Sequence, residues 1–231
     1  MAKNRKAARR RWLAAALLLL LVAGGAAWRE ARKWKPARTD YPVQGVWLDA
    51  NAMPVDWRLL HAEGADFAYL TATIGSERRD PAFGKALAAV RDRGMQAGAV
   101  IVYDACEPED GQAANFVTTV PRDSHLLPPA VSLDIDPAHC GEVPSEAALQ
   151  SELTTFLNQI ERHSGKPAIL MMSSRFEKRY HLSTMLDRNT WVEGDFIAPD
   201  YVARPWVLWT ATDRLHTPAS DAALRWVVVH P

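Results

Sequence analysis

The chain has 231 residues, of which 48% are hydrophobic and nine are tryptophan, which is enough apolar material for one sizeable globular core. Its formal net charge of zero hides an uneven distribution. Residues 1–35 hold ten Lys or Arg and one Glu, which leaves 17 basic and 26 acidic residues in the remainder. That acidic remainder excludes a nucleic acid as the expected partner, because phosphate binding requires a basic surface.

The N-terminus has the pattern of a segment that directs export. Six of the first eleven residues are basic, and residues 12–28 then carry no charge. This stretch is at the lower length limit for a membrane-spanning helix, while Gly25-Ala26-Ala27 offers small residues at which a signal could be cleaved. We expect residues 1–28 to be a signal or transmembrane anchor helix, 29–40 a tether, and 41–231 the folded domain. The expected location is the cell envelope: anchored in the inner membrane and facing the periplasm, or secreted to the periplasm after cleavage.

Strand and helix patterns alternate through the rest of the chain. Strands are expected at 43–48, 67–73, 96–103, 131–135, 168–172, 190–193, 206–211 and 226–229. Helices are expected at 56–63, 81–93, 108–119, 145–163 and 175–180. This order predicts an α/β protein with parallel strands and crossover helices. Because helices become scarce after residue 181, we expect an irregular β/α (TIM-like) barrel with fewer helices than strands.

Two acids, Asp134 and Asp136, end the fourth expected strand. Aliphatic residues alternate with polar ones through 131–136, so both carboxylates project from the face opposite the aliphatic side chains. Two residues of strand span roughly 6.6 Å, a separation at which two carboxyl groups can divide acid and base work across a glycosidic bond. The competing interpretation is that both acids cap a helix or begin a turn, which the following Pro137 favours.

The two cysteines, Cys106 and Cys140, predict one disulfide in an oxidising compartment. Each follows an expected strand, so both thiols lie on the same rim if those strands are neighbours. The disulfide would then brace the loops around the cleft. A metal site is not expected, because neither cysteine has the spacing of a metal-ligand motif.

Nine short motifs, in order from Val43 onward, resemble glycoside hydrolase family 25, the Chalaropsis-type lysozymes that cut between N-acetylmuramic acid and N-acetylglucosamine in peptidoglycan. The motifs are Gly45-Val46; Val55-Asp56-Trp57; Gly64-Ala65-Asp66-Phe67-Ala68; Ala72-Thr73-x-Gly75 with Asp80-Pro81-x-Phe83; Gln112-Ala113-x-Asn115-Phe116; Leu127-Pro128-Pro129 with Leu133-Asp134-x-Asp136; Gly165-Lys166-Pro167; Trp191-Val192; and Trp206-x-Leu208-Trp209-x-x-Thr212-Asp213.

The resemblance implies an irregular barrel with its site at the carboxyl ends of the strands, no metal or organic cofactor, and a peptidoglycan substrate. It implies that Asp134 supports the transition state or a substrate group. It also implies that Asp136 stands where the family usually has the Glu that protonates the leaving oxygen. The expected activity is that of a muramidase. The alternative is a barrel that has lost its chemistry and acts as a peptidoglycan-binding or scaffold module.

The chain departs from the family pattern mainly at the site. Trp47 occupies the position of the usual first-strand Asp, and Asp49, on the same strand face, is the candidate that replaces this carboxylate. Asp221 is the nearest candidate for another family Asp near the C-terminus, and it can equally be a cap. The aromatic candidates for sugar binding, each of which can equally be a core residue, are Trp47, Tyr103, Trp191 and Trp209.

Overall fold

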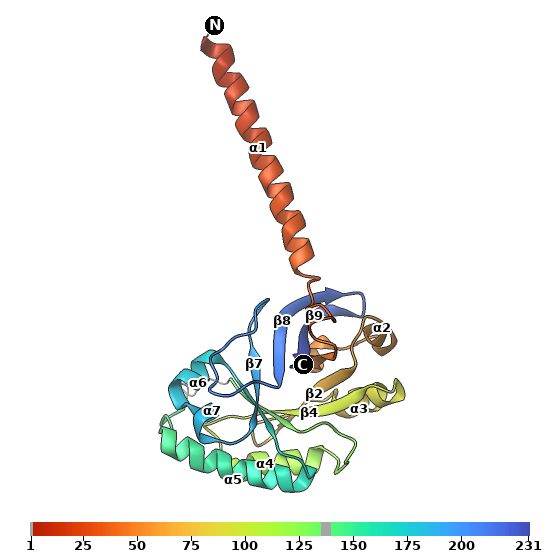
Figure 1. Ribbon diagram of the computed structural model, residues 1–231, viewed down its shortest axis with the longest axis vertical. Helices are drawn as coiled ribbons and strands as arrows, with labels where there is room; N and C mark the ends of the chain where they lie inside the picture. The colour runs from red at the N-terminus through yellow and green to blue at the C-terminus, as the bar shows by residue number, and fades with distance from the viewer. Residues whose placement is uncertain (1, 135–139) are drawn as a thin grey trace. The chain divides into compact units, whose positions relative to one another are not determined.

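The computed structural model describes residues 2–134 and 140–231, and the chain divides into two compact units, Met1–Trp34 and Lys35–Pro231. The first unit contains helix α1 (Ala2–Ala31). The second unit contains all the strands and the remaining described helices (Figure 1).

The structure bears on two features of the N-terminal region. Within the described residues, no helix is long and apolar enough to cross a membrane, so the structure does not support the anchor expected at 12–28. Residues 35–40, expected as part of a tether, belong to the second unit. There Lys35 Nζ donates a hydrogen bond to the carbonyl oxygen of Glu63 at 2.8 Å, and Gln44 Nε2 donates one to the carbonyl of Pro36 at 3.0 Å.

The second unit follows the predicted alternation of strands and helices. Its strands are β1 (Gln44–Leu48), β2 (Phe67–Ile74), β3 (Arg78–Arg79), β4 (Gln96–Val102), β5 (Ala130–Leu133), β6 (Ile169–Met172), β7 (Asn189–Glu193), β8 (Leu208–Thr217) and β9 (Ser220–Val229). Its helices are the short 3-10 helix η1 (Ala50–Ala52), α2 (Trp57–Ala62), α3 (Phe83–Asp92), α4 (Glu109–Thr119), α5 (Glu146–Ser164), α6 (Ser174–Tyr180) and α7 (Leu182–Met185).

Eight of the described strands close into a barrel. The pairing order is β1-β9-β8-β7-β6-β5-β4-β2, and a parallel β1–β2 pairing closes the ring, while β3 pairs with β2 at its side. The expected irregular barrel with fewer helices than strands is confirmed. The expectation of parallel strands throughout is corrected at the end, because β9 runs antiparallel to both β8 and β1. A hairpin needs no crossover helix, which explains why helices become scarce there.

The barrel interior is filled mainly by large side chains. Trp47, Tyr69 and Trp191 pack edge to face, with ring centroids 5.9 Å apart for Trp47–Trp191 and 5.0 Å apart for Tyr69–Trp191. Two glycines make room where strands approach closely. A Cβ at Gly45 would lie 2.3 Å from the backbone oxygen of Phe67, and one at Gly98 would lie 2.3 Å from the Tyr69 ring. The interior is therefore a packed core, and a ligand can enter only at its ends.

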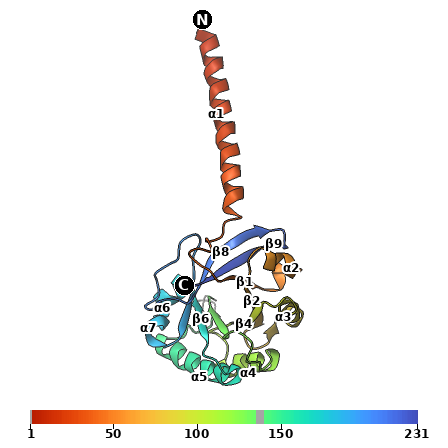
Figure 2. The same cartoon turned by 45° about the vertical axis from the view of Figure 1, so that its right-hand side comes forward.

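The helices lie outside the ring of strands, and α4 and α5 lie side by side (Figures 1 and 2). Helix α5 begins where the Ser145 side chain accepts a hydrogen bond from the Ala148 N–H, and it ends at Gly165 with φ of 71°. This is the serine N-cap and glycine C-cap that the sequence predicted. On its buried apolar face, Phe156 packs against the ring of Tyr103, the residue after β4.

Candidate active site

A pocket of about 560 Å³ opens at the carboxyl ends of β1, β2, β4 and β5. Parallel barrels carry their chemistry at this end, because loops there extend from a rigid scaffold. The lining residues are Trp47, Asp49, Ala50, Asn51, Thr71, Ile74, Arg78, Arg79, Asp80, Pro81, Val102, Ser132, Asp134 and Arg225. Carboxylates and guanidinium groups therefore share one open cavity, which suits a polar ligand rich in hydroxyl groups.

Asp134 follows β5 and lines this pocket as an exposed side chain. Alternation explains its direction: Ser132 also lines the pocket, whereas Val131 and Leu133 are fully buried on the opposite face of the strand. The face that the sequence assigned to Asp134 is the one the structure gives it. Asp136, expected on the same face, lies outside the described residues.

Asp49 lies in the same pocket, where its neighbours hold it in place. One carboxylate oxygen accepts a hydrogen bond from the Asn51 N–H at 2.9 Å, and the other lies 3.2 Å from Arg225 Nη1. Arg225 in turn lies 4.2 Å above the Trp47 ring, and the two residues face each other in the β1–β9 register. The result is a positioned carboxylate that can accept a hydrogen bond from a sugar hydroxyl or a water molecule.

Asp80 also lines the pocket, but its carboxylate already serves the backbone. Its oxygens accept hydrogen bonds from the Ala50 N–H at 2.7 Å and from the Ala82 N–H at 2.8 Å. Arg79 is similarly engaged, because its Nε donates to Asn115 Oδ1 at 2.9 Å. Both residues line the wall of the pocket; Asp80 fixes the loop that follows β1, and Arg79 ties β3 to α4.

The sequence analysis gave Glu193 no functional role and placed it only at the end of the strand expected at 190–193. It is the last residue of β7, two positions after Trp191, which packs inside the barrel. Side chains two apart on a strand share a face, so Glu193 points inward one level nearer the end of the barrel that holds the pocket. Burial raises the pKa of Glu193 to about 7, with a further contribution from the negative charge of Asp134, whereas Arg225 acts to lower it.

Tyr201 fixes the backbone at the end of β7. Its hydroxyl accepts a hydrogen bond from the Glu193 N–H at 2.8 Å and donates one to the Met172 carbonyl at 2.6 Å, which ties the ends of β7 and β6 together. Burial raises the pKa of Tyr201, so this hydroxyl keeps its proton. The Glu193 side chain therefore starts from a rigid strand end, as a functional group requires.

The comparisons with known proteins agree with this geometry. The sequence matches the model of glycosyl hydrolases family 25 over residues 49–219. The chain belongs to glycosyl hydrolase family 25. The predicted family resemblance is thus confirmed. No curated protein gives a significant match to the sequence.

Three solved structures illustrate the shared fold. A family 25 glycosyl hydrolase from Bacillus anthracis has a TM-score of 0.75 at 22% identity, over 87% of this chain and 93% of its own. A bacterial lysozyme from Streptomyces coelicolor has a TM-score of 0.73 at 17% identity, over 82% and 92%. A family GH25 lysozyme from Aspergillus fumigatus has a TM-score of 0.70 at 16% identity, over 82% and 94%.

The structure shows how this family 25 chain accommodates Trp47 at the position of the usual Asp. The Trp47 Nε1–H donates to Thr71 Oγ1 at 3.1 Å, Arg225 covers one ring face, and Trp191 meets the ring at 5.9 Å. Only 8% of Trp47 is exposed, so its ring forms the floor of the pocket rather than a broad platform. The carboxylate of Asp49 stands two residues further along the strand.

Three aromatic candidates for sugar binding are corrected by the structure, because their rings are buried. Tyr103 packs against Phe156 of α5, and Trp191 donates its Nε1–H to Thr210 Oγ1 at 2.8 Å inside the barrel. Trp209 packs against Tyr41 and donates its Nε1–H to the Gly194 carbonyl at 2.7 Å. Their large apolar surfaces stabilise the fold and offer no open face to a sugar.

Asp221 is exposed at the start of β9 and is not among the residues that line the pocket. The structure thus does not bring this candidate together with Asp49 and Asp134. The sequence left open a helix or turn cap for Asp221, and its place in β9 excludes the helix cap. In the part of the chain that the structure describes, no group of three or more His, Cys, Asp or Glu side chains is arranged to hold a metal ion.

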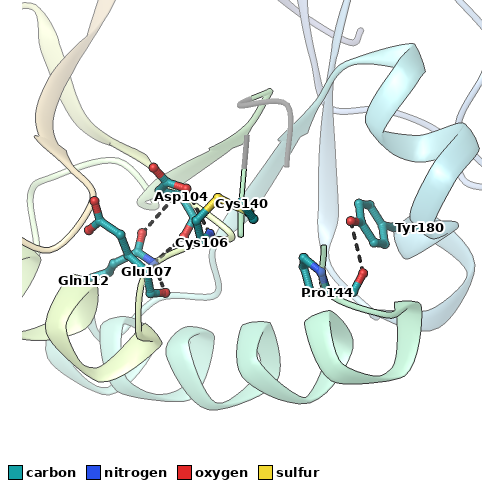
Figure 3. The surroundings of a disulfide bond; sticks show 7 residues. All are labelled: Asp104, Cys106, Glu107, Gln112, Cys140, Pro144 and Tyr180. Carbon is teal, nitrogen blue, oxygen red and sulfur yellow. Dashed lines mark hydrogen bonds between the residues drawn. A yellow bond between two sulfur atoms is a disulfide. The ribbon is translucent and has the colours of Figure 1, made fainter. Parts of the chain in front are cut away.

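The structure joins Cys106 and Cys140 in a disulfide, as the sequence predicted (Figure 3). The Cys106 N–H donates to Asp104 Oδ1 at 2.9 Å, which anchors the loop after β4. On the other side, Tyr180 of α6 donates its hydroxyl proton to the Pro144 carbonyl at 3.3 Å. The segment 140–144 is therefore held at both Cys140 and Pro144.

Proposed function

We propose that this family 25 chain hydrolyses the β-1,4 bond between N-acetylmuramic acid and N-acetylglucosamine in peptidoglycan. The observation that carries the proposal is the open pocket at the carboxyl end of the barrel, in which the exposed Asp134 carboxylate lies with the positioned Asp49. Hydrolysis of a glycosidic bond needs a carboxylate near the anomeric carbon and a proton donor for the leaving oxygen. Family membership favours this chemistry over glycan binding alone.

Asp134 is the proposed carboxylate that stabilises positive charge at the anomeric carbon, because it is exposed at the pocket directly after the end of β5. Asp49, held by Arg225, is proposed to orient a sugar hydroxyl or the attacking water. The sequence offers Asp136 as a proton donor. Its side chain is one methylene shorter than that of the family's usual Glu.

The proposed place of action is the cell envelope. The basic N-terminus followed by uncharged residues 12–28 supports export, and the predicted disulfide suits an oxidising compartment. Whether the export segment stays attached is tested by measuring the mass of the mature protein after cell fractionation. A mature protein that starts near residue 28 supports cleavage, and a full-length protein in the membrane fraction supports an anchor.

The activity is tested by the release of reducing ends from purified peptidoglycan between pH 4 and 8. We expect release by the wild-type protein and a loss of at least about 100-fold in Asp134→Asn. Asp200→Asn, which changes an exposed acid in the loop after β7, is the matched control and should behave as wild type. Retention of the protein on insoluble peptidoglycan without any cleavage by the wild type would contradict the proposal and favour a binding module.

A further inference from the structure

Glu193 is an acid at the barrel mouth to which the proposed function gives no role. Glu193 ends β7 and points to the barrel interior, in phase with Trp191. In the strand order β5-β6-β7, one strand separates it from Asp134, and both residues stand at the carboxyl ends of parallel strands. The two carboxyl groups therefore occupy the same rim of the same barrel.

The charges around Glu193 come from every side of this rim. Asp134 after β5 and Asp213 on β8 act on it as negative charges, and Arg225 on β9 acts on it as a positive charge. Tyr201 holds its backbone through the Glu193 N–H. Arg225 also forms an ion pair with Asp49, so the same guanidinium acts on both Asp49 and Glu193.

Asp134 and Glu193 differ in their exposure to water. Asp134 is exposed to water, whereas Glu193 is partly buried, and burial penalises its charged form. The surroundings of Glu193 therefore favour its protonated form. Glycosidic bond cleavage uses one carboxyl group that gives a proton to the leaving oxygen and a second carboxyl group at the anomeric carbon.

We infer that Glu193 is the proton donor to the leaving oxygen in the proposed hydrolysis, with Asp134 as the carboxylate that faces the anomeric carbon. This inference rests on the proposed function. As the bond between the anomeric carbon and the glycosidic oxygen breaks, its electron pair stays with the oxygen, which takes the Glu193 proton. One water molecule then gives its oxygen to the anomeric carbon, and the proton it releases restores the carboxyl form of Glu193.

The inference also accounts for the shortened Asp136. A donor on β7 carries a full glutamate side chain from a fixed strand end, and it does not depend on the methylene that Asp136 lacks. Asp136 would then not be the proton donor. Asp136→Asn is therefore expected to change the rates on all substrates by the same factor, whatever their leaving group.

The test compares substrates that differ in their need for a proton donor. Glu193→Gln is assayed on peptidoglycan and on an aryl chitooligosaccharide whose leaving group is dinitrophenolate, which departs without protonation. We expect a loss of at least about 100-fold on peptidoglycan and less than about tenfold on the aryl glycoside, with loss of the alkaline limb of the pH profile. Asp200→Asn is the control, Glu193→Asp is a second variant, and thermal melting verifies that each variant folds.

Several results would overturn the inference. Equal losses on both substrates would make Glu193 a structural residue, and wild-type activity of Glu193→Gln on peptidoglycan would exclude it as the donor. If Asp136→Asn, and not Glu193→Gln, lost activity on peptidoglycan but kept it on the aryl glycoside, Asp136 would be the proton donor. No cleavage of either substrate by the wild-type protein would refute the proposed hydrolysis itself, which distinguishes that failure from the others.

Discussion

Replacing Glu193 by Gln should make the protein more stable at neutral and alkaline pH. The pKa of Glu193 is raised in the folded state from an ordinary 4.5 to about 7, mainly by burial. The folded protein therefore binds this proton more tightly than the unfolded chain. The stabilisation is complete below pH 4.5 and is lost as the pH rises through 7, because the folded state must then hold a buried negative charge.

The size of the effect follows from the same pKa values. At about 1.4 kcal/mol per pKa unit, the difference between 4.5 and about 7 corresponds to about 3 kcal/mol as an upper estimate. Glutamine has nearly the same shape and no charge to bury. In a chain of this size, about 3 kcal/mol corresponds to a rise in the melting temperature of about 6–12 °C.

The assay is urea or thermal unfolding of the wild type and Glu193→Gln at pH 4, 6 and 8. The stability difference between the two proteins should grow steadily across this range in favour of Glu193→Gln. Asp200→Asn removes an exposed carboxylate and should show no such trend. A stability difference that stays constant from pH 4 to pH 8 would refute the claim that Glu193 is enclosed, whatever its role in turnover.

Three further outcomes follow from the geometry. Asp134→Asn should abolish turnover and shift the melting temperature by less than about 2 °C, because the side chain is exposed; a large loss of stability would contradict this placement. Trp191→Phe should cost about 1–3 kcal/mol in unfolding experiments, because it removes buried ring area and the hydrogen bond to Thr210, and sugar affinity measured by calorimetry should not change. Reduction of the Cys106–Cys140 disulfide, which closes a loop with a sequence separation of 34, should cost about 3–4 kcal/mol, and equal melting temperatures with and without a reducing agent would contradict this.

The predicted elements agreed with the structure where a residue type marks one kind of boundary, as a helix cap does. Ser145 and Gly165 were predicted to bound α5, and they do so as its caps. The hairpin of β8 and β9 was missed as an antiparallel pair, because alternation of apolar residues does not encode strand direction. The two strands are antiparallel because the connection between Thr217 and Ser220 is short enough to form a hairpin.

The aromatic residues show where sequence reasoning had to fail. Tyr103, Trp191 and Trp209 all lie in or beside strands, and strands of a barrel covered by helices are apolar on both faces. A tryptophan that faces the interior, the outer helices or the pocket therefore has the same local pattern. Only the closed barrel shows that Trp191 is enclosed and that Trp47 reaches the pocket floor.

The sequence by itself determined the family, the alternation of strands and helices, and the strand face from which Asp134 projects, because all three depend on motifs and periodicities along the chain. The tertiary structure decided that Asp49 pairs with Arg225 and that Glu193 joins Asp134 at the barrel mouth. These residues lie far apart in the sequence. Their proximity, and the burial that sets the proton affinity of Glu193, exist only once the strands have closed into a ring.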